Sequence, residues 1–271
     1  MLEHILYHEN SQTHSDVIQE DYYANSDNIF IVADGITLES GSGVERPKST
    51  DSFDVAKIAS EETLAELNKK FFNTNDIKNA LVKANKKVAS YLRGRTLYKN
   101  RERNGFMFGS TLIAVGGIIN DRLLYGVLDD CLISVFSSDL IDHPIFKNDV
   151  TKTFRYFETH YDKSKTKDLK FFKKNLRNHK VVINGQTYGY GAIDGRKGFE
   201  QFIQLGEVTL KDNDLICIYS DGFIKPINDL DFVKTIYNSK LTNETLKYLT
   251  EYLRKNNISK EKTCYFIRYR K

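Results

Sequence analysis

Residues 28–35 read Asn-Ile-Phe-Ile-Val-Ala-Asp-Gly, a short apolar run that is followed at once by an acidic residue and a glycine. An unbroken run of β-branched and aromatic side chains of this length is typical of a buried strand. Because Asp-Gly is a common turn dipeptide, the strand is expected to end in a turn at Asp34. The stretch therefore predicts a buried strand with a carboxylate at its carboxyl end.

Helical periodicity follows this strand. Apolar residues recur at three- and four-residue spacing over residues 53–71 and 75–91, and a third helix is predicted over residues 243–255. Ser49, Thr50 and Asp51 are candidate caps for the first of these helices.

Strand-like runs fill much of the remaining chain. They cover residues 110–119, 122–128, 132–136, 202–210, 214–219 and 264–269, and the fourth and fifth are expected to pair with each other. Short turns between neighbouring runs favour antiparallel sheets, whose faces the helices must cover. We therefore predict an α+β fold. Because no repeat or linker-like segment interrupts the sequence, residues 1–271 are expected to form a single domain.

The overall composition narrows the class of protein. A formal net charge of +4 over 271 residues is too small to favour a dedicated nucleic-acid binder. The sequence has no apolar run long enough to span a membrane, and its first residues lack the pattern of a secretory signal. The three cysteines lie far apart in apolar runs, which suggests buried free thiols in a reducing compartment. We therefore expect a cytoplasmic protein that does not bind a membrane and is not a dedicated nucleic-acid binder.

Acidic residues recur where apolar strands end. Asp34-Gly35, Asp129-Asp130 and Asp221-Gly222 each follow such a run. A carboxylate that leaves water needs a partner, and a site built only of oxygen ligands suits Mg²⁺ or Mn²⁺. Each Asp-Gly is equally compatible with a plain turn. The spacing alone leaves both a metal site and ordinary turns open.

Six motifs follow one another along the chain. They are Gln19-Glu20-Asp21, Asp34-Gly35, residues 108–112 (Phe-Gly-Ser-Thr-Leu), residues 129–132 (Asp-Asp-Cys-Leu), residues 188–195 (Tyr-Gly-Tyr-Gly-Ala-Ile-Asp-Gly), and the block from Gly206-Glu207 to Ser220-Asp221-Gly222-Phe223. In this order they resemble the motifs of the metal-dependent PPM (protein phosphatase 2C-like) family of protein phosphatases, in its bacterial form.

The resemblance implies a fold and a chemistry. The fold is a four-layer αββα sandwich, in which two antiparallel β-sheets are flanked by helices. The chemistry is hydrolysis of phosphoserine or phosphothreonine on a phosphorylated protein substrate, by a water activated at a centre of two Mg²⁺ or Mn²⁺ ions, with a possible third and weaker site. The resemblance implies catalytic roles for Asp34 and Asp221. The metal-site residues that it implies are Glu20, Asp34, Gly35, Asp130, Asp221 and Glu261.

The sequence departs from the family pattern at positions that matter for this chemistry. Lys260 stands where the last metal-binding aspartate is expected, and Glu261 is the candidate replacement ligand. Asp16 stands where the family often has an arginine that grips phosphate, and Arg46 and Lys48 are the candidate substrate-binding replacements. If Lys260 pointed into the site, its ammonium would stand in for a cation and repel Mg²⁺.

Alternative functions follow from these departures. One is an active serine/threonine phosphatase, and another is a catalytically weakened relative, a pseudophosphatase that acts as a binding or regulatory module. A third, a nucleic-acid-associated module, rests on the basic residues between Lys163 and Lys180. Leu169, Phe172 and Leu176 lie there at helical spacing, which favours the solvated basic face of an amphipathic helix instead. The sequence carries no signal for an oligomeric state.

Overall fold

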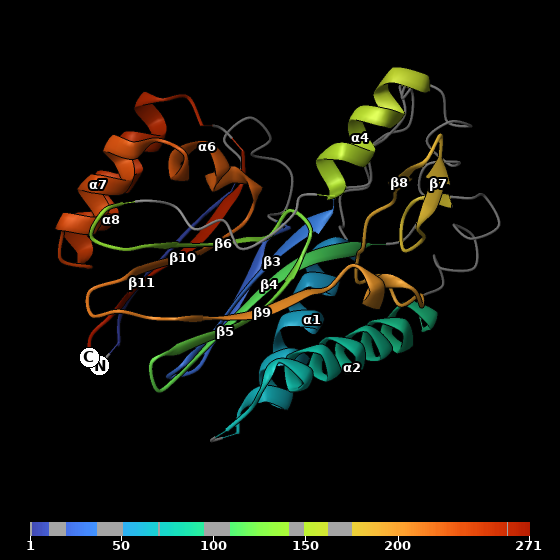
Figure 1. Cartoon of the computed structure of the whole chain (residues 1–271), viewed down its shortest axis with the longest axis horizontal. Coiled ribbons are helices and arrows are strands. Elements are labelled where there is room, and N and C mark those ends of the chain that lie inside the picture. Colours follow the sequence, from blue (N-terminus) through green and yellow to red (C-terminus); the bar gives the residue numbers. More distant parts are fainter. Residues whose placement is uncertain are drawn as a thin grey trace.

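Two antiparallel β-sheets lie face to face at the centre of the molecule (Figure 1). The computed structural model describes residues 2–10, 20–36, 51–69, 71–94, 109–140, 149–161, 175–258 and 260–271. One sheet has the strand order β2 (Tyr22–Asn25), β3 (Ile29–Ile36), β4 (Ser110–Ile119), β5 (Arg122–Leu128) and β9 (Gln204–Thr209). The other has the order β1 (Leu2–Glu9), β11 (Lys262–Tyr269), β10 (Leu215–Tyr219) and β6 (Leu132–Phe136).

Helices cover both outer faces of this pair of sheets. α1 (Asp51–Leu67) and α2 (Thr74–Arg93) pack on the five-stranded sheet, and α6 (Ile224–Ile227), α7 (Leu230–Asn238) and α8 (Asn243–Lys255) lie on the four-stranded sheet. Beside the sandwich, α4 (Asp149–His160) contacts the small hairpin of β7 (Val181–Ile183) and β8 (Gln186–Tyr188). The predicted four-layer αββα arrangement is therefore confirmed.

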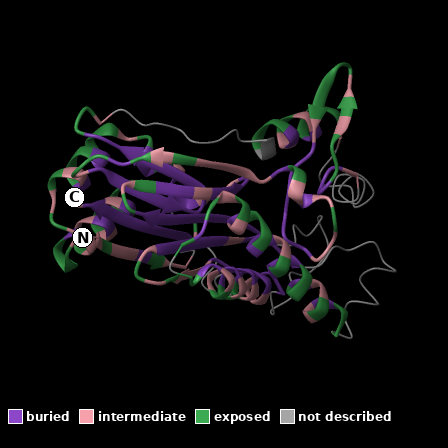
Figure 2. Ribbon diagram, turned by 60° about the horizontal axis from the view of Figure 1, so that its bottom comes forward, coloured by how far each residue is buried: buried purple, intermediate pink, exposed green. Residues whose placement is uncertain are grey.

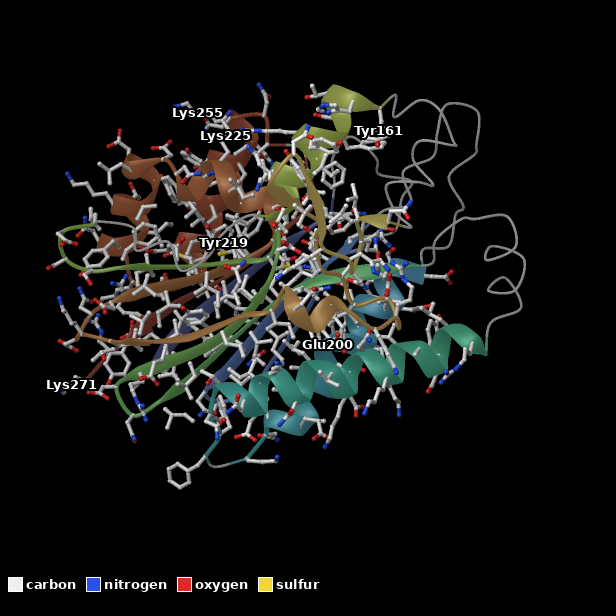
Figure 3. All side chains as sticks on the ribbon, turned by 45° about the vertical axis from the view of Figure 1, so that its right-hand side comes forward. Tyr161, Glu200, Tyr219, Lys225, Lys255 and Lys271 are labelled. Atoms are coloured by element: carbon white, nitrogen blue, oxygen red, sulfur yellow. The ribbon has the colours of Figure 1, made fainter. Side chains whose placement is uncertain are left out.

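The layers explain why the strands read as unbroken apolar runs. Along β3, Ile29 and Ile31 face the helices, whereas Phe30 and Val32 face the other sheet. Because both faces of each central strand are covered, alternation between apolar and polar residues disappears. Figure 2 shows the central strands β3, β4, β10 and β11 almost entirely buried, whereas β1, β2 and β9 are partly exposed. In Figure 3 Tyr219 lies within the packed interior.

The core between the two sheets offers a first test of this packing. Ile267 on β11 is fully buried there, so Ile267→Val removes one methylene group from a filled space. We expect the free energy of unfolding to fall by about 0.5–1.5 kcal/mol. Denaturant titration measures it, with Val182→Ala on the exposed side of β7 as the control, which should change stability by less than about 0.5 kcal/mol. Equal losses in the two variants would contradict the layer assignment.

Several sequence predictions differ from the structure in instructive ways. The runs 202–210 and 214–219 were expected to pair, but β9 joins β5 and β10 joins β6 and β11. The connection crosses between the sheets through Asn213, whose φ of 72° turns the chain there. Asp34 and Gly35 do not form a turn, because they lie inside β3 opposite Leu112 and Thr111.

The basic segment is also corrected in part. Most of it lies outside the described residues, but Arg177 is buried at 2% exposure and does not belong to a solvated face. Its guanidinium donates hydrogen bonds to the Tyr190 hydroxyl and to Ser110 Oγ, both at 2.9 Å. Such bonds are what a buried charged side chain requires, so Arg177 supports the structure and does not supply a surface charge for nucleic acid.

None of the helices in the described ranges combines the length and the apolar character that a membrane span requires. The three cysteines are free and buried, as predicted.

Candidate active site

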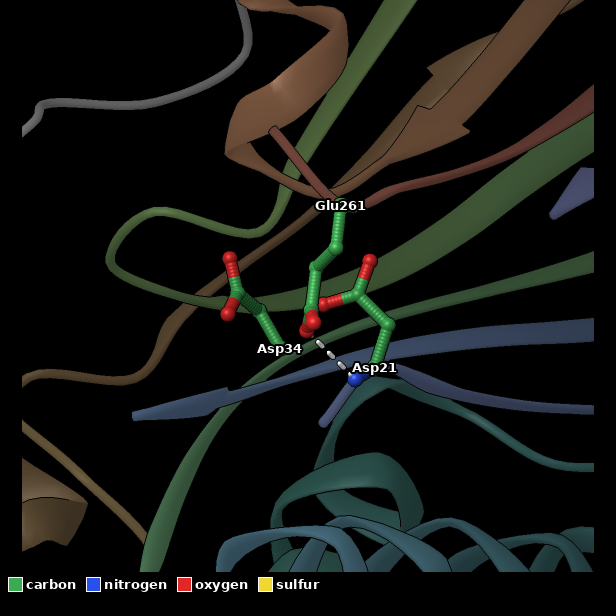
Figure 4. A group of neighbouring side chains, drawn as sticks. All are labelled: Asp21, Asp34 and Glu261. Atoms are coloured by element: carbon green, nitrogen blue, oxygen red, sulfur yellow. Dashed lines mark hydrogen bonds between the residues drawn. The ribbon is translucent and has the colours of Figure 1, made fainter. Parts of the chain in front are cut away.

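Three carboxylates from distant parts of the sequence meet at one end of the sandwich. Asp21 precedes β2, Asp34 lies near the end of β3, and Glu261 precedes β11. One oxygen of each side chain lies within 4.8 Å of the other two. Figure 4 shows Glu261 reaching from the side of the four-stranded sheet toward Asp21 and Asp34. The antiparallel registers of both sheets place these positions at the same end of the strands, so the group spans the two sheets.

Asp21 is fixed through one of its two oxygens. Its Oδ2 accepts hydrogen bonds from Ser220 Oγ at 2.7 Å and from Thr263 Oγ1 at 2.9 Å. Its Oδ1 is buried and has no hydrogen-bond partner among the described residues. The residue is 1% exposed. A buried carboxylate oxygen without a donor is costly, and none of the described residues donates a hydrogen bond to this atom.

Two backbone amides hold Glu261. The amide of Asp21 donates to Oε1 at 2.8 Å, and the amide of Glu20 donates to both oxygens at 3.0 and 3.1 Å. Dashed lines in Figure 4 mark the contact with Asp21. The carboxylate of Glu261 therefore ties the segment before β2 to the segment before β11, and it stays directed at Asp34.

The electrostatics of the group reflect this crowding. Burial raises the pKa of Asp34 well above its usual value, and repulsion from the carboxylates around it acts in the same direction. Those carboxylates belong to Asp21, Asp221, Glu261 and Asp130. Burial, followed by repulsion from Glu261, raises the pKa of Asp21 as well. Carboxylates gathered in this way are stable only when a proton or a cation offsets their charge.

A cation fits this donor set. All three side chains offer oxygen, which is what Mg²⁺ and Mn²⁺ prefer, and no histidine or cysteine of the described residues belongs to the group. The buried Oδ1 of Asp21 accepts no hydrogen bond from a described residue, so its lone pairs are free to coordinate a cation. The residues that could hold the ion are Asp21, Asp34 and Glu261.

Asp221 lies at the same end of the molecule but has a different partner. It follows β10 in a short 3₁₀ turn, and its Oδ2 lies 2.6 Å from Lys260 Nζ. Burial acts to lower the pKa of Lys260, but attraction and hydrogen bonding to Asp221 outweigh it and leave that pKa above its usual value. Lys260 is therefore a charged ammonium directed at a carboxylate.

Solved structures share this architecture, although no protein-family model and no curated protein sequence matches the chain. The Mycobacterium tuberculosis serine/threonine phosphatase PstP/Ppp superposes with a TM-score of 0.65 at 13% identity, over 100% of this chain and 99% of that one. The chain has the PPM phosphatase fold. Stp1 of Staphylococcus aureus gives a TM-score of 0.64 at 15% identity over 100% of this chain and 96% of that one. The S. agalactiae serine/threonine phosphatase gives 0.62 at 15% identity over the full length of both chains. The catalytic domain of PstP has been solved in complex with two manganese ions.

Within this PPM fold, the structure places the predicted site residues as follows. Asp34 and Glu261 lie in the carboxylate group. Asp130 is close enough to contribute to the raised pKa of Asp34. Glu20 is buried, but the residue that joins the group is its neighbour Asp21. Arg46 and Lys48, together with Asp16, lie outside the described residues.

Sequence reasoning missed the residues that orient the site. Asp21 belongs to the motif Gln19-Glu20-Asp21 but received no role, although its carboxylate lies beside those of Asp34 and Glu261. Ser220 also belongs to one of the six motifs, and Thr263 directly precedes the predicted strand at residues 264–269. A hydroxyl beside an acidic residue is too common a pattern to reveal such contacts.

Glycine packing sets how closely the site segments approach one another. A Cβ on Gly35 would lie 2.6 Å from the carbonyl oxygen of Glu20, and a Cβ on Gly222 would lie 2.2 Å from that of Glu261. The glycine of each Asp-Gly pair is therefore packed against the backbone of another acidic residue, Glu20 for Gly35 and Glu261 for Gly222. The glycines are needed for close approach of backbone to backbone.

Proposed function

We propose that this chain is a metal-dependent phosphatase that removes phosphate from phosphoserine or phosphothreonine in proteins. The observation that carries the proposal is the convergence of Asp21, Asp34 and Glu261, with a buried oxygen on Asp21 to which no described residue donates a hydrogen bond. The PPM fold supports it, since the solved structures that share this fold include serine/threonine phosphatases.

In this proposal some residues of the site bind the ion and others orient its ligands. Asp21, Asp34 and Glu261 would hold a Mg²⁺ or Mn²⁺ ion. When bound, such an ion lowers the pKa of a nearby water and offsets charge on phosphoryl oxygens. Ser220 and Thr263 keep Asp21 in one orientation, and the amides of Glu20 and Asp21 do the same for Glu261. No protein nucleophile is required.

Further assignments belong to the same proposal. We assign substrate binding to Arg46 and Lys48, because a phosphorylated side chain needs a cationic partner. Gly35, Asp130, Asp221 and Glu20 remain candidate members of the metal centre. The free, buried cysteines support action in the reducing cytoplasm, and residues 1–271 are proposed to act as one domain.

The proposal is tested with phosphoserine and phosphothreonine peptides. Metal-stripped protein is supplied with Mn²⁺, and release of inorganic phosphate is followed with and without a chelator. We expect hydrolysis that depends on the metal. Absence of phosphate release at saturating Mn²⁺ would contradict the proposed activity.

One observation favours the second candidate function, a binding module of reduced activity. The ion pair between Lys260 and Asp221 engages a carboxylate that the resemblance assigns to the metal centre. A module of this kind would bind the phosphorylated peptide with measurable affinity and release no phosphate. Fluorescence anisotropy of the labelled peptide, measured beside phosphate release, separates the two functions.

The hydroxyl of Ser220 allows the orientation of Asp21 to be tested. Ser220→Ala removes the 2.7 Å hydrogen bond to Asp21 and the acceptor of the Thr263 amide. We expect Mn²⁺ affinity to fall about 10- to 100-fold, as for other residues that orient metal ligands. Ser137→Ala is the matched control, because Ser137 bonds Asp214 at 2.8 Å at the opposite end of the same sheet. A similar loss of affinity in both variants would assign the effect to general destabilisation.

A further inference from the structure

The described residues supply one group of three carboxylates close enough to share an ion. Asp221 is not part of this group, although it lies near enough to raise the pKa of Asp34. PstP, which shares the fold, holds two manganese ions. The number of cations that this chain binds is therefore a separate question from whether it binds any.

Lys260 lies where it can determine how many cations bind. Its ammonium donates a hydrogen bond to Asp221 Oδ2 at 2.6 Å, and Asp34 and Asp130 also attract it. A monovalent charge so close to Asp221 opposes a divalent ion at the same oxygen, because both would claim the same lone pairs and would repel each other.

The backbone near Lys260 is anchored, although its side chain is 67% exposed. Lys262 is fully buried and donates a hydrogen bond to the Lys260 carbonyl at 2.8 Å. Lys262 in turn lies 3.4 Å from Glu9 on the neighbouring strand. On the other side, the carbonyl of Glu261 packs against Gly222, next to Asp221. These contacts keep residue 260 beside residue 221.

We propose that this chain binds one divalent cation, at Asp21, Asp34 and Glu261, and that the Lys260 ammonium takes the place of a second cation beside Asp221. This rests on the metal centre of the proposed function. An ammonium offers charge and hydrogen bonds to an anionic substrate, but it does not coordinate water. Lys260 would therefore supply the positive charge of a second ion, but not its ability to coordinate water.

Calorimetric titration with Mn²⁺ tests the proposal without any measurement of activity. Metal-stripped wild-type protein is compared with Lys260→Asp, which replaces the ammonium by a carboxylate. We expect one Mn²⁺ per chain in the wild type and two in the variant, with affinity at the second site raised at least about tenfold. Lys211→Asp is the matched control, because Lys211 is exposed and lies in the turn before β10, at the opposite end of that strand from Asp221. It should keep the wild-type stoichiometry.

A second variant separates charge from coordination. Lys260→Gln removes the ammonium and adds no carboxylate, so it should admit a second Mn²⁺ more weakly than Lys260→Asp does. Far-ultraviolet circular dichroism and denaturant titration establish that each variant is folded.

The outcomes distinguish this inference from the proposed function. Two Mn²⁺ ions bound to the wild type would overturn the role of Lys260 and leave the metal centre intact. One ion in both the wild type and Lys260→Asp would also overturn it, because the ammonium would then not be what limits the stoichiometry. No binding in any variant would overturn the metal centre itself.

Discussion

Replacement of Asp34 by asparagine should lower the Mn²⁺-dependent release of phosphate by about 10²- to 10³-fold, the usual loss when one charge-stabilising group leaves an active site. Asp34 faces Asp21 and Glu261, and the surrounding carboxylates all repel its negative charge. The amide keeps the shape of the side chain but removes the negative charge that a cation requires. Binding of Mn²⁺ should weaken in parallel.

The same substitution should have the opposite effect on the stability of the metal-free protein. Burial and, after it, repulsion from the surrounding carboxylates raise the pKa of Asp34, and a neutral amide avoids both costs, so the midpoint of thermal unfolding should rise without metal. Stabilisation that accompanies lost activity is the signature of a functional residue and not of a structural one.

Asp121→Asn provides the matched control for this prediction. Asp121 lies in the turn between β4 and β5, at the opposite end of the sheet that carries Asp34. It should leave Mn²⁺ binding, phosphate release and the unfolding midpoint unchanged. If Asp34→Asn retained activity within about threefold of the wild type, or if it lowered the stability of the metal-free protein, the assigned role of Asp34 would be wrong.

Apolar runs and their order were sufficient to predict most of the sandwich. The runs 110–119, 122–128 and 132–136 coincide with β4, β5 and β6, and residues 243–255 coincide with α8. The pairing of strands across the two sheets was less accessible. β9 and β10 are adjacent in the chain, yet they lie in different sheets, and a short turn looks the same in sequence whether it closes a hairpin or joins two sheets.

The candidate site was predictable in kind but not in detail. Acidic residues at strand ends indicated which carboxylates could meet, because β3 and β5 both pair antiparallel with β4 and therefore end on the same side of the sheet. The choice of Asp21 over Glu20 depends on which of two adjacent buried side chains lies beside Asp34 and Glu261. The pairing of Lys260 with Asp221 depends on the path of the segment before β11. Neither is set by residue type or spacing.

The Asp34-Gly35 pair shows most clearly how a local motif acquires its meaning from packing. Read as a dipeptide it indicates a turn, but both residues lie in β3 and pair with β4. Gly35 matters because its Cα faces the backbone of Glu20, with no room for a side chain between them. The same contact sets the distance between the strand that carries Asp34 and the segment that carries Asp21.

Gly35→Ala should therefore damage stability and metal binding together. The added Cβ would lie 2.6 Å from the Glu20 carbonyl oxygen and 2.8 Å from its Cβ, so the segment before β2 must move. We expect a loss of about 3 kcal/mol in the free energy of unfolding, at the upper end of the usual cost of overpacking. Because Asp21 and the amides that hold Glu261 move with that segment, Mn²⁺ affinity should fall by at least about tenfold.

Gly116→Ala is the control that isolates the site from the strain. Gly116 lies in β4 of the same sheet, and a Cβ there would come closest to the Cδ1 atoms of Ile218 and Leu123, at the ends of their side chains. Side-chain ends can rotate away, so this variant should lose about 1 kcal/mol and bind Mn²⁺ as the wild type does. Denaturant titration and calorimetry on both variants measure the two effects. If Gly35→Ala bound Mn²⁺ normally, the contact with Glu20 would not be what positions Asp21, and the carboxylate group would have to be held by the hydroxyls of Ser220 and Thr263 alone.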